Sequence, residues 1–183
     1  DIEQELMRAF ALKEVPSYMV CANIPYNITS PILFKLLEQC SSLTAATLMI
    51  QKEVAQRIVA GPGSKTYGLL SISAGYYATT QYVMTVSRHC FYPEPEVDSS
   101  VIRIIPREIM PEVYDEKLFK TLLKAAFQKR RKTMLNICNS FFPQEKAQVE
   151  DTIKSIGLDP GARPENLSME DFVALANRFA KEG

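Results

Sequence analysis

Short apolar runs alternate with segments of helical periodicity through roughly the first 105 residues, and this alternation most constrains the fold. The runs that predict strands are 18–22, 46–50, 82–86 and 100–105. The segments that predict helices are 1–14, 31–37, 52–60 and 69–77. Pro31 suits a first helical position, with Thr29 or Ser30 as the cap. Alternating strands and helices indicate an α/β domain, and the closing pair of strands indicates a mixed sheet edge.

The pattern changes after Pro106 and Pro111. Three later segments carry helical periodicity without a strand-like run between them, namely 115–139, 144–156 and 169–181. We therefore predict an α/β domain over residues 1–110 and an all-helical domain over 111–183.

Composition argues against several classes of protein. No apolar run reaches about 18 residues, so we expect no membrane span. The four cysteines form no C-x-x-C pair and there is one histidine, which argues against a metal site. Free thiols fit a reducing compartment, so we expect a cytoplasmic protein. The formal net charge is zero, so any affinity for nucleic acid must come from a local patch.

The tetrapeptide Asn23-Ile24-Pro25-Tyr26 closes the first predicted strand, where open α/β sheets bind ligands. Its chemistry suits an exocyclic amine. The Asn23 side-chain oxygen and the Ile24 carbonyl can each accept a hydrogen bond from an N–H₂ group. Pro25 stiffens the turn, and Tyr26 offers a flat face on which a base can stack.

The extended run from Asn23 to Pro31 resembles the ribosomal RNA adenine dimethyltransferases, a family of S-adenosylmethionine-dependent enzymes. Further segments match the same family in the same order, namely 51–57, 60–68, 91–101, 127–133 with Asn136, and 163–167. The Arg-Arg-Lys-Thr and Arg-x-Glu-x-Leu segments are similar to the small-subunit enzymes rather than to the large-subunit macrolide-resistance methylases. The run Tyr67-Gly68-Leu69-Leu70-Ser71 resembles the bacterial pattern more than the eukaryotic one.

This resemblance implies a fold, an activity and partners. The fold would be α/β, the C-terminal part of a Rossmann-like methyltransferase domain followed by a small all-α domain. The reaction would be dimethylation of N6 of adenosines in small-subunit ribosomal RNA, coupled to maturation of the immature small subunit, with no metal. Asn23, Ile24, Pro25 and Tyr26 would be catalytic, Tyr26 and Phe91 would stack on the base, and Asn23 and Pro25 would also face S-adenosylmethionine.

One part of the family pattern is absent from this sequence. Family members carry a glycine-rich loop between their first strand and helix, whereas residues 1–22 contain no glycine and no initiator methionine. Gly61-Pro62-Gly63 follows a predicted helix instead of a strand, so it does not fit that role. We therefore expect a truncated chain that lacks the main cofactor motif, exposes an apolar sheet edge and is inactive alone.

Several assignments keep an alternative. Asn23 could serve as a turn or capping residue, and Tyr26 and Phe91 could pack in a core. Asp98 and Ser99 are expected to cap or bend their loop rather than to take part in chemistry. The basic cluster Lys129, Arg130, Arg131 and Lys132, like Arg57, could contact RNA or form a solvated face. The alternatives to the enzyme are a non-catalytic RNA-binding assembly factor for the small subunit, and a methylase of another RNA or of DNA.

Overall fold

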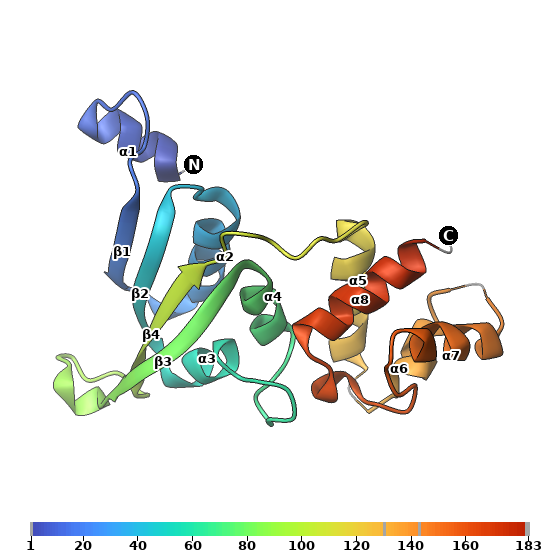
Figure 1. The fold of residues 1–183 in the computed structure, drawn as a ribbon. Coiled ribbons are helices and arrows are strands. Elements are labelled where there is room, and N and C mark those ends of the chain that lie inside the picture. The colour runs from blue at the N-terminus through green and yellow to red at the C-terminus, as the bar shows by residue number, and fades with distance from the viewer. Residues whose placement is uncertain (1, 130, 143, 182–183) are drawn as a thin grey trace. The chain divides into compact units, whose positions relative to one another are not determined.

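The computed structural model describes residues 2–129, 131–142 and 144–181 (Figure 1). The chain divides into two compact units. The first contains Asp1–Val59 and Ser73–Ile109, and the second contains Ala60–Ile72 and Met110–Gly183. Each unit is described separately.

The first unit is built on one four-stranded mixed sheet with the order β1-β2-β4-β3 (Figure 1). Its strands are β1 (Tyr18–Asn23), β2 (Leu43–Gln51), β3 (Ala78–Val86) and β4 (Ser99–Pro106). β1 runs parallel to β2, whereas β4 is antiparallel to both β2 and β3. The four predicted strands and the mixed sheet are therefore confirmed.

Helices accompany the sheet as the alternation predicts. They are α1 (Ile2–Phe10), α2 (Thr29–Gln39), α3 (Lys52–Ile58) and α4 (Leu69–Tyr77), with short 3₁₀ turns at Tyr26–Ile28 and Arg88–Cys90. The division between the two units falls within α4. α2 forms the crossover that a parallel strand pair requires, because two parallel strands cannot be joined by a tight turn.

The core of the first unit lies on one face of the sheet. Ile102 and Ile104 of β4 are fully buried and alternate with Arg103, as expected for a strand with one face in the core. Buried side chains from β2 and the helices complete this core, namely Leu48, Ile50, Leu33, Leu36, Ala55 and Ile58. Burial of each large aliphatic side chain contributes about 1.5–3 kcal/mol. On the edge strand β1, Met19 is 76% exposed.

Among the described residues of the second unit, every regular element is a helix. Its helices are α5 (Glu116–Gln128), α6 (Met134–Cys138), α7 (Lys146–Ser155) and α8 (Met169–Ala180), with a 3₁₀ turn at Pro164–Asn166. Phe172 of α8 is fully buried and packs near Phe127 of α5, with ring centroids 5.9 Å apart. Ser168 and Asp171 form a capping box that begins α8.

The prediction of one continuous helix over 115–139 is wrong, because α5 ends at Gln128 and α6 begins at Met134. The hydroxyl of Thr133 accepts a hydrogen bond from the Asn136 N–H and caps the new helix. The N–H groups of Met134 and Leu135 donate to the carbonyls of Ala162 and Pro160. A distant loop thus satisfies the first-turn donors that a continuous helix would have used internally.

Residues 60–72 belong to the helical unit, although they lie between α3 and β3 in the sequence. The Gly63 N–H donates to the Glu165 carbonyl at 2.7 Å, and the Tyr67 hydroxyl donates to the Leu167 carbonyl at 2.8 Å. The Tyr67 ring meets the Phe127 ring edge-on, and burial raises the pKa of the Tyr67 phenol. The predicted domain bounds, 1–110 and 111–183, stay a prediction. The compact units differ from these bounds because residues 60–72 belong to the second unit.

Candidate active site

The predicted tetrapeptide forms the carboxyl end of β1 and the turn that follows it. Asn23 is the last residue of β1 and pairs with Met49 of β2, and the Ile24 N–H donates to the Met49 carbonyl at 3.0 Å. The Ile24 side chain is 3% exposed, so it anchors the turn in the core. Asn23 and Pro25 are exposed, which leaves the Asn23 amide available to a ligand.

A 3₁₀ turn over Tyr26–Ile28 leads directly into α2, which begins at Thr29. The Thr29 hydroxyl donates backward to the Pro25 and Tyr26 carbonyls, at 3.4 and 3.3 Å. The prediction that Thr29 or Ser30 caps a helix starting at Pro31 is therefore wrong. Thr29 already lies inside the helix, where its hydroxyl binds the preceding turn instead of a first-turn N–H.

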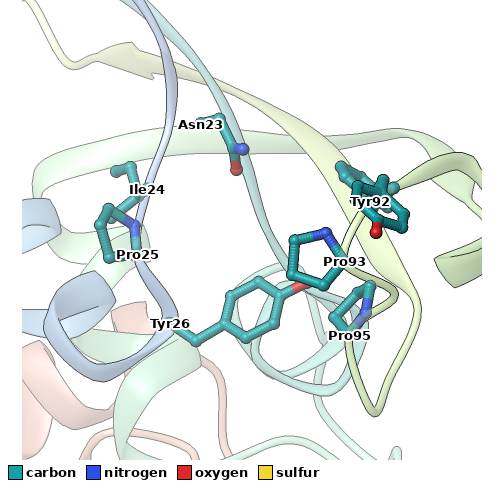
Figure 2. A pocket seen from close by; sticks show the side chains of 8 residues that line it. Asn23, Ile24, Pro25, Tyr26, Tyr92, Pro93 and Pro95 are labelled. Carbon is teal, nitrogen blue, oxygen red and sulfur yellow. The ribbon is translucent and has the colours of Figure 1, made fainter.

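The loop between β3 and β4 forms the second wall of a pocket of about 300 Å³ (Figure 2). The pocket is lined by Asn23, Ile24, Pro25, Tyr26, Phe91, Tyr92, Pro93 and Pro95. Figure 2 shows the Asn23 amide directed toward the side of the pocket on which the Tyr26 ring and Pro93 lie. The structure thus brings the five predicted site residues together, while their roles stay predictions.

Three lining residues of this loop were missed by the sequence reasoning: Tyr92, Pro93 and Pro95. Tyr92 is fully exposed, so it has no packing role in the core. The signal that could have identified all three is the proline-rich composition of the loop, because prolines hold a loop in an extended shape and present its side chains.

Asp98 connects the end of the loop between β3 and β4 to the start of that loop and to α3. Its carboxylate accepts hydrogen bonds from the Arg88 backbone N–H at 3.1 Å and from the Lys52 ammonium at 3.3 Å. The Arg88 N–H and then Lys52 hold the pKa of the Asp98 carboxyl below its ordinary value. Arg88 also forms an ion pair with Glu94 at 3.1 Å, so both ends of the loop are held by charged groups.

The described residues of the predicted basic cluster lie between the end of α5 and the start of α6. Lys129 is the C-cap of α5, and its ammonium lies 3.4 Å from the Ser140 hydroxyl and 5.9 Å from the centroid of the Phe141 ring. Arg131 and Lys132 are exposed, whereas Arg130 lies outside the described residues. Arg57, the fifth residue assigned to RNA, is exposed on α3 in the other unit.

The cluster continues an array of lysines along α5. Lys117, Lys120 and Lys124 are exposed and line one groove on this helix. Glu116 at the start of the helix also lines the groove and forms an ion pair with Lys120 at 3.4 Å. Residues 117–132 contain seven of the 21 lysines and arginines and no acidic residue. Positive charge in this neutral chain is therefore concentrated on α5 and the turn that follows it.

Metal and membrane sites were also sought among the described residues. No group of three or more histidine, cysteine or acidic side chains there is arranged to hold a metal ion. None of the helices in the described ranges is both long and apolar enough to cross a membrane. All four cysteines are free thiols.

Comparison with known proteins relates the chain to curated methyltransferases. The family model described as "Ribosomal RNA adenine dimethylase" matches residues 2–181. A "Ribosomal RNA small subunit methyltransferase A" of Bacillus cytotoxicus is 47% identical over 169 residues, covering 90% of this chain. The protein of the same name from Bacillus mycoides is 44% identical over the same length. The chain spans 58% of the length of both relatives.

Solved structures share the fold. A dimethyladenosine transferase from Plasmodium falciparum superposes with a TM-score of 0.76 at 30% identity, covering 94% of this chain and 71% of that one. The 23S rRNA methyltransferase ErmE superposes with a TM-score of 0.67 at 19% identity, which shows the fold alone. The predicted Rossmann-like methyltransferase fold is confirmed. With a family model that matches nearly every residue and relatives at 44–47% identity, this chain belongs to the ribosomal RNA adenine dimethylase family.

Proposed function

We propose that the protein containing this chain transfers methyl groups from S-adenosylmethionine to N6 of adenosines in small-subunit ribosomal RNA, twice at each base. The observation that carries this proposal is the pocket between the Asn23–Tyr26 turn and the Phe91 loop. It combines hydrogen-bond acceptors with aromatic walls at the carboxyl end of a parallel strand, the usual ligand position in such sheets. The immature small subunit is the proposed partner.

Asn23 and Ile24 bind the amine that accepts the methyl group. The adenine amine is a weak nucleophile, because its lone pair is delocalised into the ring. In the first transfer the Asn23 side-chain oxygen and the Ile24 carbonyl would each accept one N–H, which favours a pyramidal nitrogen with its lone pair directed at the methyl group. In the second transfer the one remaining N–H would bind one of these acceptors. In each transfer the bonding pair of the broken C–S bond would stay on sulfur as a neutral thioether, and the methylated nitrogen would release one proton to solvent. Positioning of the amine against the methyl group then provides most of the acceleration.

Tyr26 and Phe91 bind the base itself. The target adenine has to leave its stack, which costs a few kcal/mol. Stacking on an aromatic side chain stabilises each bound base by about 1–3 kcal/mol. Two aromatic walls therefore offset much of the free energy needed to unstack the adenine. Tyr26 and Phe91 both line the pocket, which supports a sandwich of the base between them.

S-adenosylmethionine supplies an electrophilic sulfonium methyl group when bound. Asn23 and Pro25 fit its reactive end, because both are exposed at the carboxyl end of β1 beside the proposed amine site. No glycine lies in the turn between β1 and α2 or at the junction of β2 and α3, so we assign no residue of this chain to the rest of the cofactor. The expected inactivity of the chain alone stays a prediction.

The basic array supports RNA as the substrate. Lys129, Arg131 and Lys132 extend the exposed lysines of α5, and such arrays bind the phosphate backbone irrespective of sequence. Small-subunit RNA as substrate would locate the protein in the cytoplasm, a compartment in which four free cysteines remain reduced.

The test is a methyl-transfer assay on the complete protein and on this chain alone. Each is supplied with labelled S-adenosylmethionine and undermethylated small ribosomal subunits, and mass spectrometry identifies the nucleoside formed. We expect N6,N6-dimethyladenosine from the complete protein only. Asn23→Ala should lower transfer by roughly 100-fold or more without changing the thermal unfolding.

Asn27→Ala is the matched control, because Asn27 is an exposed asparagine in the same turn that does not line the pocket. Its activity should equal that of the wild type. Subunit binding by the complete protein without any methyl transfer would contradict the proposed function, and normal transfer by Asn23→Ala would contradict the assigned mechanism.

A further inference from the structure

Three consecutive polar residues, Asp98 just before β4 and Ser99 and Ser100 at its start, bind four different elements. Asp98 holds Arg88 and Lys52, as described above. The Ser99 hydroxyl lies 2.8 Å from the hydroxyl of Tyr26, and the Ser100 hydroxyl lies 2.7 Å from the hydroxyl of Tyr82. Successive strand residues point to opposite faces, so the two serines bind tyrosines on opposite sides of the sheet.

We propose that Ser99 is a positioning residue that holds the Tyr26 ring in place as the stacking surface for the target base. This inference rests on the proposed function and adds a residue to its machinery. A tyrosine side chain joined to the backbone at one end can change rotamer about its first torsion, which moves the whole ring. A hydrogen bond at the hydroxyl fixes the far end of the ring, so the ring stays in one position at the wall of the pocket.

The burial of Ser99 indicates that its hydrogen bond to Tyr26 is a structural contact of the folded protein and not an incidental one at the surface. Ser99 is 1% exposed, so its hydroxyl requires a partner within the protein. Tyr26 is only partly buried, and its ring lines the pocket. The partner that satisfies Ser99 is therefore the phenol of a ring whose face is open to a ligand.

The positions of Tyr26 and Ser99 in the chain also support the positioning role of Ser99. Tyr26 follows β1, and Ser99 follows the loop that carries Phe91. The hydrogen bond between them therefore joins the two walls of the pocket and sets the separation between the two proposed stacking residues. Phenylalanine at position 26 would provide an equal stacking face without this link, so the hydroxyl and the ring have separable functions.

The test measures kcat and KM of methyl transfer for the complete protein with Ser99→Ala, Tyr26→Phe and both changes. We expect each single change to lower kcat by roughly 2- to 12-fold, the loss of one hydrogen bond. KM for the ribosomal subunit should change little, because most of the RNA contact lies elsewhere. The double variant should be no worse than the more affected single variant, because both changes remove the same bond. Ser99→Thr, which keeps the hydroxyl, should restore activity.

Ser100→Ala is the matched control. It removes a hydroxyl with the same burial and the same kind of partner, on the side of the sheet away from the pocket. It should lower the melting temperature about as much as Ser99→Ala does, yet leave kcat unchanged.

A second measurement follows the first side-chain torsion of Tyr26 directly by NMR couplings. We expect one rotamer in the wild type and averaging over several rotamers in Ser99→Ala. An unchanged rotamer distribution, an unchanged kcat in Ser99→Ala, or additive losses in the double variant would each overturn the proposal. A wild-type protein that transfers no methyl group would instead overturn the proposed function, and the role of Ser99 with it, whatever the rotamer measurement gives.

Discussion

Phe91 reaches the pocket from a loop far along the chain from Tyr26, and it is half-buried at the wall that faces the Asn23–Tyr26 turn. The motif at 23–26 could be recognised from sequence because its residues are adjacent and follow a strand. The bond between Tyr26 and Ser99 could not, because 73 positions separate them and no periodicity indicates which hydroxyl a distant phenol meets. Adjacent residues of a motif can be recognised from sequence, whereas the distant residues that hold them in place are identified only in the folded structure.

We predict that Phe91→Leu lowers kcat/KM for methyl transfer by roughly 5- to 150-fold, the loss of one base–aromatic stacking contact. Leucine keeps most of the apolar volume, so the loop should retain its shape. Steady-state kinetics on small ribosomal subunits provides the measurement. Phe91→Tyr keeps a π face and should retain activity. Equal activity of the leucine variant would mean that Phe91 only packs.

At the scale of elements, periodicity predicted every strand and helix of the first unit to within a few residues, because each carries its own apolar pattern. Over 115–139 the helical periodicity continues from α5 into α6, so it did not predict that α5 ends at Gln128 and α6 begins at Met134. The break depends on carbonyls at Pro160 and Ala162, which no local pattern reveals. Lys129, Arg131 and Lys132 consequently lie in a turn, where their side chains are not confined to one helix face.

The lysines of α5 lead to a prediction about salt. If Lys124 contacts RNA phosphate, Lys124→Gln should weaken binding to the small subunit and make the slope of log K against log salt shallower by about 0.7–0.9. Binding measured across a range of salt concentrations gives this slope. Lys146→Gln is the control, because Lys146 is an exposed helical lysine of the same unit outside the array. An unchanged slope for Lys124→Gln would remove α5 from the RNA contact surface.

At the scale of the whole molecule, the two compact units do not follow chain order, since residues 60–72 belong to the helical unit. Three segments of the family pattern meet there. Tyr67 from the first contacts Phe127 from the second and donates to Leu167 from the third. Their order in the sequence identified the family, but their meeting in space could not be predicted, because a domain boundary inferred from composition assumes that each domain is continuous.

This arrangement predicts which backbone N–H groups exchange faster with solvent when one unit is destabilised. Phe172→Leu should destabilise the helical unit by roughly 1–3 kcal/mol, because Phe172 is fully buried beside Phe127. In hydrogen exchange under mildly denaturing conditions, the Tyr67 N–H, which donates to Ser64, should then exchange faster. The Ile24 N–H, which donates to Met49 in the sheet, should be unaffected.

The reciprocal variant is Ile102→Val, at a fully buried position of β4, which should cost about 0.5–1.5 kcal/mol. It should accelerate exchange at Ile24 and leave Tyr67 unchanged. If Tyr67 instead follows Ile24 in both variants, residues 60–72 unfold with the sheet, and the helical unit is a continuous C-terminal domain. If Tyr67 follows Phe172, the segment between α3 and α4 is a structural part of the helical unit, so a fragment starting at residue 111 would lack contacts on which its core depends.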